Sequence, residues 1–207
     1  MALPKETFFN LPPDKRERVI DAALDEFAER SYHDARVTAI AENAGIAKGS
    51  FYQYFEDKKD LFKYIIGLVA DKKLEYINKD MMENIQDYSF FQVLRELYLS
   101  GIRFAKEHPR LLSIGMQLMN NQALYHEVFM DNLDLSYEFY GKLLMKGVAD
   151  GDIDPTIDIT VSSRLLTMCN YALVDLVSRD GFFDLDDMAI IEKMLHIVEN
   201  GIRRKDH

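Results

Sequence analysis

A glycine between two short segments with apolar faces constrains the fold of this 207-residue chain more than any other feature. Residues 37–44 carry apolar side chains at helical spacing, Gly45 follows at once, and a second helical pattern starts at about residue 47. Glycine readily adopts the left-handed conformation that ends a helix. The two predicted buried faces are made by Ile40, Ala41 and Ala44, and by Phe51 and Phe55. Residues 37–62 therefore predict a helix-turn-helix followed by the start of a further helix.

The other side of the second short helix is predicted to be small and polar. It carries Lys48, Gly49, Ser50, Tyr52, Gln53 and Tyr54. Basic, hydroxylated and aromatic-polar groups suit the floor of a DNA groove and the phosphates along its walls. The alternative is a surface helical hairpin that binds no nucleic acid, but it leaves Gly49-Ser50, Tyr52 and Tyr54 without a packing purpose. The sequence therefore favours DNA binding.

This stretch resembles the TetR family of bacterial one-component regulators. The residues that carry the resemblance are Ile40-Ala41, Ala44-Gly45-Ile46, Gly49-Ser50-Phe51-Tyr52, Tyr54-Phe55, Lys58 and Leu61, and the pattern reaches back through Phe27 and Ala22-Ala23 to about Arg16. The remainder of the chain matches the family only in helical character and length. The resemblance implies an N-terminal part that binds DNA and an effector pocket in the remainder.

The chain departs from the family pattern at the start of the first short helix. Family members commonly carry Ser or Thr four residues before the Ile-Ala pair and an acid three residues later, but these positions are Arg36 and Ala39 here. The usual capping box is therefore absent. Asp34, Thr38 or the bare backbone is left to serve the first amides of this helix.

A further helix is predicted to begin after Asp57, which is a good N-terminal cap. Lys58 lies in its first turn, where a positive charge opposes the helix dipole. This unfavourable position indicates that Lys58 serves an external phosphate. The complete predicted set of DNA contacts is Val37, Thr38, Lys48, Gly49, Ser50, Tyr52, Gln53, Tyr54 and Lys58.

The net charge of −10 argues at first against DNA, because a protein that binds DNA with its whole surface is basic. The local charge matters more, since salt screens exposed charges beyond ~10 Å. Within residues 45–59, the three lysines Lys48, Lys58 and Lys59 outnumber the two acids Glu56 and Asp57. We therefore expect local affinity for DNA, with the acidity elsewhere reducing non-specific binding.

The single cysteine, Cys169, excludes a disulfide within the chain and suits a reducing cytoplasm. The N-terminus lacks the apolar core of a signal peptide. The apolar stretch 161–177 is interrupted by Arg164, Asn170 and Asp175, so no membrane span is expected. There is no zinc-protease motif and no phosphate-binding glycine loop, so neither a metal nor a cofactor is predicted.

Few prolines and glycines, five and ten, favour an all-α fold. Residues 1–11 are predicted to form an arm whose Phe8 and Phe9 fold back onto the first helix. We expect residues 1–63 to form a three-helix DNA-binding domain. A long helix, reaching as far as Met82, joins it to a helical effector-binding and dimerisation domain, residues 64–207.

The last two predicted helices, about 156–179 and 185–204, each carry two apolar stripes. One stripe suffices for a helix on the surface of a monomer, so two indicate burial on two sides. A central core helix is one explanation; a four-helix interface between two copies explains both helices better. The predicted interface consists of Leu166, Cys169, Leu173, Val177, Ile190, Met194 and Ile197.

Methionine and aromatic residues recur between residues 90 and 175. Taken singly they are core residues, but as a group they suit an adaptable cavity, because methionine conforms to varied ligands. The predicted effector pocket consists of Met116, Met119, Phe129, Tyr137, Tyr140, Met168 and Tyr171.

The sequence thus predicts a homodimeric transcriptional regulator, a repressor that a small, largely apolar effector releases from a palindromic operator on double-stranded DNA. An all-helical enzyme with an apolar substrate pocket is the competing class, and it predicts turnover and no operator. A helical scaffold that binds only protein is a third class, which leaves Tyr52 and Tyr54 unexplained.

Overall fold

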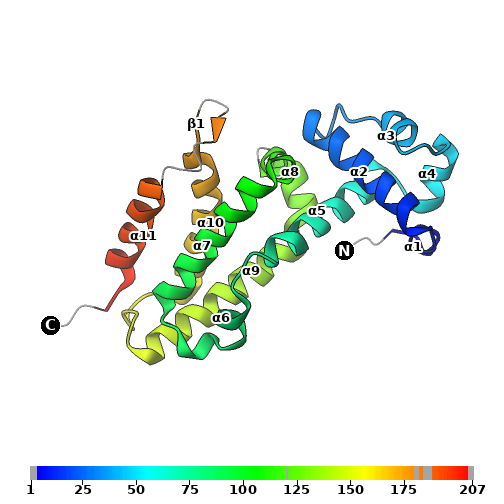
Figure 1. Cartoon of the computed structure of the whole chain (residues 1–207). Coiled ribbons are helices and arrows are strands. Elements are labelled where there is room, and N and C mark those ends of the chain that lie inside the picture. Colours follow the sequence, from blue (N-terminus) through cyan, green and yellow to red (C-terminus); the bar gives the residue numbers. More distant parts are fainter. Residues whose placement is uncertain (1–3, 120, 180–181, 184–187, 205–207) are drawn as a thin grey trace. The chain divides into compact units, whose positions relative to one another are not determined.

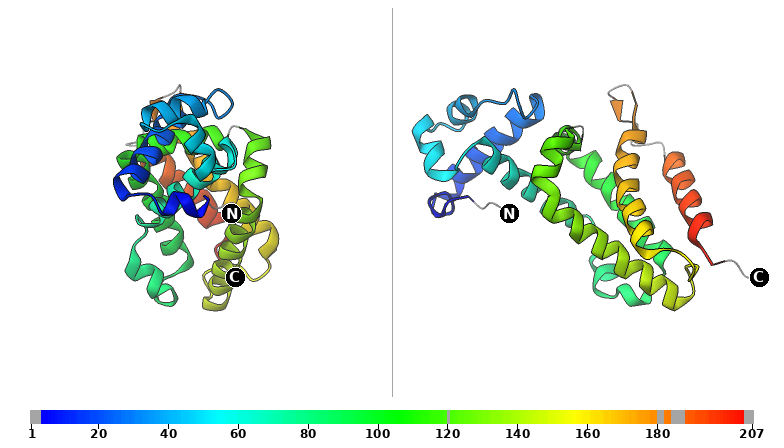
Figure 2. Two further views of the ribbon diagram at one scale, coloured as in Figure 1. Left: turned by 90° about the vertical axis from the view of Figure 1, so that its right-hand side faces the viewer. Right: turned by 180° about the vertical axis from the view of Figure 1, so that it is seen from behind.

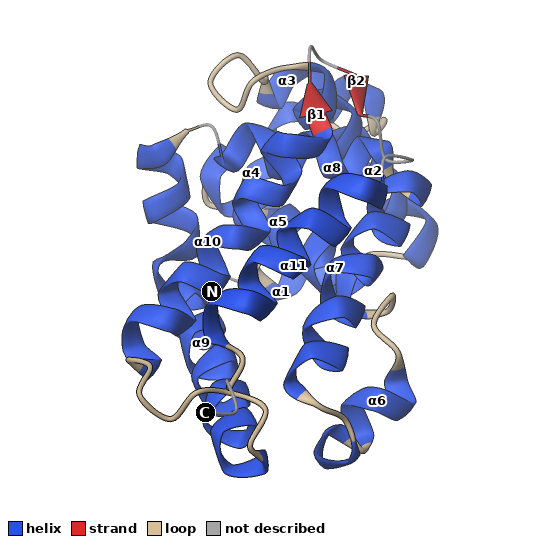
Figure 3. Cartoon of the chain, turned by 90° about the vertical axis from the view of Figure 1, so that its left-hand side faces the viewer, coloured by secondary structure: helices blue, strands red, loops and turns tan. Residues whose placement is uncertain are grey.

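The computed structural model describes residues 4–119, 121–179, 182–183 and 188–204, and helices make up most of them (Figure 1, Figure 3). Some side chains within 119–135 and 170–191 lie outside this description. The α-helices are α1 (Glu6–Phe9), α2 (Pro13–Glu29), α3 (Val37–Asn43), α4 (Lys48–Tyr54), α5 (Lys58–Leu74), α6 (Lys79–Glu83), α7 (Phe90–Glu107), α8 (Pro109–Met119), α9 (Gln122–Asp150), α10 (Ile159–Val177) and α11 (Met188–Ile202). A 3-10 turn, η1 (Ile85–Asp87), follows α6, and two short antiparallel strands, β1 (Ser178–Arg179) and β2 (Phe182–Phe183), follow α10. The all-α fold class is confirmed.

The chain forms two compact units. The first consists of Met1–Leu74 and His108–Val128, and the second of Glu75–Glu107 and Phe129–His207. The first unit thus holds α1 to α5, α8 and the beginning of α9. The predicted boundary of the DNA-binding domain, between residues 63 and 64, stays a prediction. Packing in the structure groups α8 with the N-terminal helices. The helix α5 ends at Leu74 and does not reach Met82.

Aromatic side chains form the centre of the first unit. Phe8, Phe27, Phe51, Phe55 and Phe62 are each at most 1% exposed. The rings of Phe27 and Phe62 meet edge to face with centroids 4.9 Å apart, and those of Phe8 and Phe55 lie 4.8 Å apart. Such rings bury large areas and attract one another through their quadrupoles. The predicted burial of Phe51 and Phe55 is confirmed.

The turn between α3 and α4 has the conformation that the sequence predicts. Gly45 has a φ of 68°, the left-handed region that L side chains rarely adopt. The Gly45 N–H donates to the Glu42 carbonyl at 3.1 Å, and the Ile46 N–H donates to the Ala41 carbonyl at 2.9 Å. These two bonds form a Schellman motif, which satisfies the last carbonyls of α3.

In the second unit, α7, α9, α10 and α11 contribute to one apolar core cluster. It includes Phe90, Leu94, Tyr98, Tyr140, Leu144, Leu166 and Leu195. The right-hand view of Figure 2 shows α10 and α11 side by side. No helix in the described part of the chain is long and apolar enough to cross a membrane.

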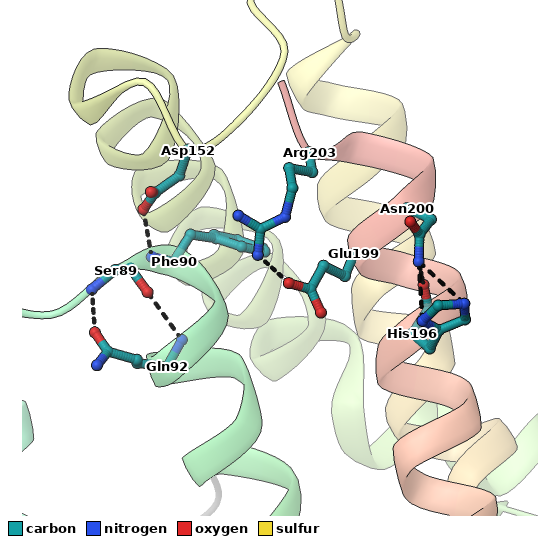
Figure 4. A network of polar contacts seen from close by, with 8 residues as sticks. All are labelled: Ser89, Phe90, Gln92, Asp152, His196, Glu199, Asn200 and Arg203. Carbon is teal, nitrogen blue, oxygen red and sulfur yellow. Dashed lines mark hydrogen bonds and ion pairs between the residues drawn. The ribbon is translucent and has the colours of Figure 1, made fainter. Parts of the chain in front are cut away.

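The start of α7 is fixed by a capping box, shown in Figure 4. The Gln92 N–H donates to Ser89 Oγ at 3.3 Å, and the Ser89 N–H donates to Gln92 Oε1 at 2.8 Å. Asp152, from the loop after α9, accepts a third bond from the Phe90 N–H at 3.0 Å. These contacts tie α7 to the end of α9 and hold the first core residue of α7 in place.

Candidate nucleic-acid interface

The exposed face of α4 carries most of the side chains that the sequence predicts to contact DNA. Lys48, Gly49 and Gln53 are exposed, Ser50 is half-buried, and Tyr52 is 46% exposed. The polar ends of Lys48, Tyr52 and Gln53 have no hydrogen-bond or ion-pair partner among the residues that the structure describes. These groups are therefore available to an external partner.

A glutamate from another helix holds the start of α3. No side chain of α3 or its N-cap residue Arg36 caps the helix. Instead, the Arg36 N–H donates to Oε1 of Glu26, a residue of α2 that is 5% exposed, at 2.9 Å. In a capping box, the acceptor is an acid at the third helical position, which is Ala39 here. Glu26 takes over this role, and Val37 and Thr38 lie half-buried at the first two positions of α3.

None of the caps considered from the sequence serves this helix. Asp34 instead accepts a 2.7 Å bond from the hydroxyl of Ser31 in the preceding loop. The available signal was the position of Glu26, directly before Phe27 in the apolar stripe of the first helix. A buried carboxylate requires hydrogen-bond donors, so a glutamate there points to an internal role.

Tyr54 does not belong to the exposed face, which differs from the prediction. Its side chain is 5% exposed, and its ring lies 6.0 Å from that of Phe8, centroid to centroid. Tyr54 follows Phe51 by three residues, so both lie on the same side of α4. The short helix α1 covers that side. The ring of Tyr54 therefore packs against the N-terminal arm.

The start of α5 is capped by Asp57, as predicted. Asp57 Oδ1 accepts a bond from the Asp60 N–H at 2.8 Å. Asp60 Oδ2 in turn accepts a bond from the Glu56 N–H at 3.1 Å. Two backbone donors next to the helix start are therefore satisfied by carboxylates, which also complement the helix dipole.

Lys58 makes contacts within the protein that compete with the predicted phosphate contact. Its Nζ donates to the carbonyls of His33 at 3.0 Å and Ala35 at 2.8 Å, both in the loop between α2 and α3. The same ammonium lies 4.8 Å from the centroid of the Tyr32 ring. Burial lowers the pKa of Lys58. The lysine tolerates its position against the dipole of α5 because loop carbonyls and an aromatic face surround it.

The predicted effector residues have different environments. Tyr140 is 5% exposed and belongs to the core of the second unit, whereas Met168 is 43% exposed. Tyr137 is half-buried, with the Arg164 guanidinium 5.5 Å from its ring centroid. Met116 is half-buried in the first unit. The side chains of Met119, Phe129 and Tyr171 lie outside the described residues.

A residue that the sequence did not single out, Tyr98, is the unusual polar group of this core. It is 1% exposed, and its hydroxyl has no hydrogen-bond partner among the side chains that the structure describes. Burial is the main cause that raises its pKa, followed by Tyr140 and Cys169. Buried hydroxyls are nearly always hydrogen-bonded, so this donor calls for a partner.

Among the described residues, no cluster of His, Cys, Asp and Glu side chains is placed to hold a metal ion.

The two described residues of the predicted dimer stripe on α10 pack toward the core of their own subunit. Leu166 is 4% exposed within the core cluster, and Cys169 packs half-buried against it. On α11, Met194 packs against the same cluster, whereas Ile197 is 71% exposed. The side chains of Leu173, Val177 and Ile190 lie outside the described residues. Leu166 is therefore covered by its own subunit and has little surface left for a partner, whereas the rest of the predicted interface stays a prediction.

The exposed apolar residues of α10 form its other stripe. Val161 is 54% exposed, Leu165 is 61% exposed and Met168 is 43% exposed. Their spacing, four and then three residues, places them on one side of the helix. A row of large apolar side chains in water is unfavourable, and such patches commonly mark interaction sites.

The fold and the exposed face of α4 define a helix-turn-helix regulator, and the comparisons with known proteins agree. The family "Bacterial regulatory proteins, tetR family" matches residues 19–65. A TetR family transcriptional regulator from Chloroflexus aurantiacus J-10-FL has a similar structure, with 31% sequence identity and a TM-score of 0.68 over 98% of this chain and 100% of that chain. This chain belongs to the TetR family of transcriptional regulators, which bind DNA and are not enzymes.

One similar protein is named for fatty acid metabolism, and one similar structure is a complex with stearoyl-CoA. The fatty acid metabolism regulator protein of Bacillus subtilis (strain 168) is 25% identical over 194 residues, which are 92% of this chain and 97% of that protein. The structure of the transcriptional regulator FadR from Bacillus subtilis in complex with stearoyl-CoA has 25% identity and a TM-score of 0.71. The similarity covers 90% of this chain and 98% of the FadR chain.

Replacement of Lys58 by alanine is expected to lower the free energy of unfolding without changing how DNA affinity depends on salt. Two charge-assisted hydrogen bonds to the loop before α3 are lost, which predicts a loss of about 1–3 kcal/mol at this half-buried position. Urea denaturation measures the loss. Lys48→Ala is the matched control, because that lysine has no internal partner among the described residues.

The opposite pattern would contradict the internal role of Lys58. If Lys58→Ala leaves stability unchanged but lowers the salt slope of DNA binding by about 1 per half-site, the lysine contacts phosphate.

Proposed function

We propose that this protein is a repressor that binds a palindromic operator as a homodimer and that a long-chain acyl-CoA releases it. The observation that carries the proposal is the face of α4, whose polar groups have no internal partner among the described residues although the helix itself is firmly packed. A rigid helix with free polar side chains is what reading a DNA groove requires.

Lys48 is the proposed base-reading residue. It is the first residue of α4, and residues at the start of a recognition helix are those that reach base edges in this kind of domain. Ser50, Tyr52 and Gln53 supply further hydrogen-bonding groups along the helix. Val37 and Thr38 of α3 are proposed to contact the DNA backbone. Tyr54 and Lys58 are left out of the set, because both serve the protein interior.

The exposed stripe of Val161, Leu165 and Met168 on α10, with Ile197 on α11, is the proposed dimer interface. These side chains are large, apolar and exposed, and α10 packs against α11. A two-fold axis would cover the stripe with its own copy and would double every contact. It would also pair two recognition helices with the two halves of a palindromic operator.

The unpartnered hydroxyl of Tyr98 supports an effector site in the core of the second unit. It lies within an apolar cluster, and no acceptor for it is found in the described part of the chain. A ligand with an apolar chain and a carbonyl oxygen would match both properties. An acyl thioester has this chemistry. One similar protein is named for fatty acid metabolism, and one similar structure is a complex with stearoyl-CoA. The ligand must prefer the state that cannot bind DNA.

Helix α8 offers a route from the effector to the DNA-binding helices. Arg110, the second residue of α8, pairs with Asp25 at 2.6 Å and with Asp21 at 3.2 Å, both on α2. Ser113 Oγ and Gln117 Nε2 of α8 both donate to the carbonyl of Ala28, at 3.2 and 3.3 Å. Only His108 separates α8 from α7, which carries Tyr98. A movement of α7 would therefore act on α8 through the chain, and α8 would act on α2 through these contacts.

A gel shift with the DNA upstream of the protein's own gene tests the proposed function. We expect a retarded band that stearoyl-CoA abolishes and that coenzyme A alone does not. Tyr98→Phe should raise the stearoyl-CoA concentration for half-release by roughly 2–10-fold, because one hydrogen bond to the ligand is lost. Its stability should not fall, since the hydroxyl has no partner within the described residues. An unchanged response in Tyr98→Phe would remove this residue from the site.

Replacement of Lys48 by alanine should relax the preference for one base position in each half-site. The expected cost is ~1–3 kcal/mol at that position if the lysine bonds two acceptors of guanine. Binding to a set of operator variants with single base changes measures it. Equal weakening of all variants would instead make Lys48 a phosphate contact.

Leu165→Glu should convert the dimer into a monomer, because it places a carboxylate on each side of the axis within an apolar interface. Sedimentation measures the mass, and circular dichroism confirms that the helices remain. Leu74→Glu is a matched control, since Leu74 is 62% exposed and Leu165 is 61% exposed. A Leu165→Glu protein that stays dimeric and keeps its operator affinity would place the interface elsewhere.

A further inference from the structure

The last carbonyls of α4 cannot be satisfied within the helix, because the final four C=O groups of an α-helix have no partner inside it. This matters for a helix of seven residues, in which such groups are the majority. The carbonyl of Phe51 is satisfied by the N–H of Phe55 at 2.9 Å, directly after the helix. The carbonyls of the remaining three residues face a segment more than forty positions earlier in the chain.

The N-terminal arm satisfies all three of these carbonyls. Lys5 Nζ donates to the carbonyl of Tyr52 at 3.0 Å, and the Lys5 N–H donates to that of Tyr54 at 2.8 Å. Between them, the hydroxyl of Thr7 donates to the carbonyl of Gln53. Residues 5–7 therefore form a complete cap for the C-terminus of α4. The ammonium of Lys5 also complements the negative end of the helix dipole.

Two further contacts hold the arm against the protein. Phe8 is fully buried, and its ring centroid lies 4.8 Å from that of Phe55 and 5.5 Å from that of Tyr64. Lys5 forms an ion pair with Glu56 at 2.8 Å. The side chain of Phe8 anchors the segment, so the donors of Lys5 and Thr7 meet α4 in a fixed geometry.

We propose that Lys5 and Thr7 are positioning residues for sequence recognition. They fix the end of α4, so that the helix presents its exposed face to the groove in one orientation. They act through the backbone of α4 and make no contact with DNA themselves. The proposal rests on the proposed binding of an operator by α4. Lys5 and Thr7 thus contribute to specificity without contacting a base.

The experiment starts from a DNA duplex that the unaltered protein selects from a random library. Affinity for this duplex and for a scrambled duplex of equal length is then measured at several salt concentrations. Thr7→Val removes the hydroxyl donor and keeps the shape of the side chain, whereas Thr7→Ser keeps the donor. We expect Thr7→Val to reduce the ratio of specific to non-specific affinity by roughly 3–10-fold per subunit, with an unchanged salt slope, and Thr7→Ser to restore it.

Lys5 is tested with a control that separates its two contacts. Lys5→Met removes the bond to Tyr52 and the ion pair with Glu56, whereas Glu56→Gln removes only the ion pair. We expect Lys5→Met to lower the specificity ratio and Glu56→Gln to leave it unchanged. If Lys5→Met instead weakens both duplexes equally and lowers the salt slope by about 1 per half-site, Lys5 contacts phosphate and the proposal is wrong for this residue.

Hydrogen exchange of the free protein distinguishes failure of this proposal from failure of the proposed operator function. Thr7→Val should accelerate exchange of the α4 amides relative to Thr7→Ser, because the helix end is released. Unchanged exchange together with an unchanged specificity ratio would overturn the proposal. If the unaltered protein selects no duplex, the operator function fails, and exchange alone decides: acceleration supports the cap on α4, and unchanged exchange overturns it.

Discussion

The ends of two seven-residue helices set the main physical constraint on the DNA-binding part. Helices as short as α3 and α4 are unstable alone, because most of their backbone groups have no partner inside the helix. The structure supplies the partners from elsewhere. Glu26 serves the start of α3, the Gly45 turn serves its end, and residues 5–7 serve the end of α4. The aromatic core beneath then holds both helices in position.

Several lysines of the DNA-binding part also have partners within the protein. Lys58 and Lys5 donate hydrogen bonds to backbone carbonyls, and Lys59 forms an ion pair with Glu127 at 2.6 Å. Lys48 has no internal partner among the described residues. In a chain with a net charge of −10, such a sparse positive face favours binding that depends on hydrogen bonds and correct orientation over general attraction to phosphate. Accurate positioning of α4 is then a requirement of recognition.

In the second unit, the packing of the core cluster determines which apolar stripe of α10 stays exposed. Both stripes of α10 have helical spacing and apolar residues, so the sequence offers two equivalent choices. The core cluster takes Leu166 with Tyr98 and Tyr140, and Leu165 is thereby turned outward. The described residues of the other stripe, Val161, Leu165 and Met168, stay exposed in the single subunit. The proposed dimer and the proposed effector site are therefore coupled, because one helix, α10, contributes to both.

The sequence by itself determined the local features of this protein: the all-α class, the Gly45 turn, the cap at Asp57 and the buried faces of the helix-turn-helix. Each of these follows from residues within a few positions of one another, through backbone conformation and helical spacing. Tertiary structure alone decided which acceptor holds α3, what Lys58 and Tyr54 contact, and which stripe of α10 faces the core. These contacts join residues far apart in the chain, such as Lys58 with Ala35 and Lys5 with Tyr52. Spacing fixes the face of a helix on which a residue lies, but only packing determines what that face meets.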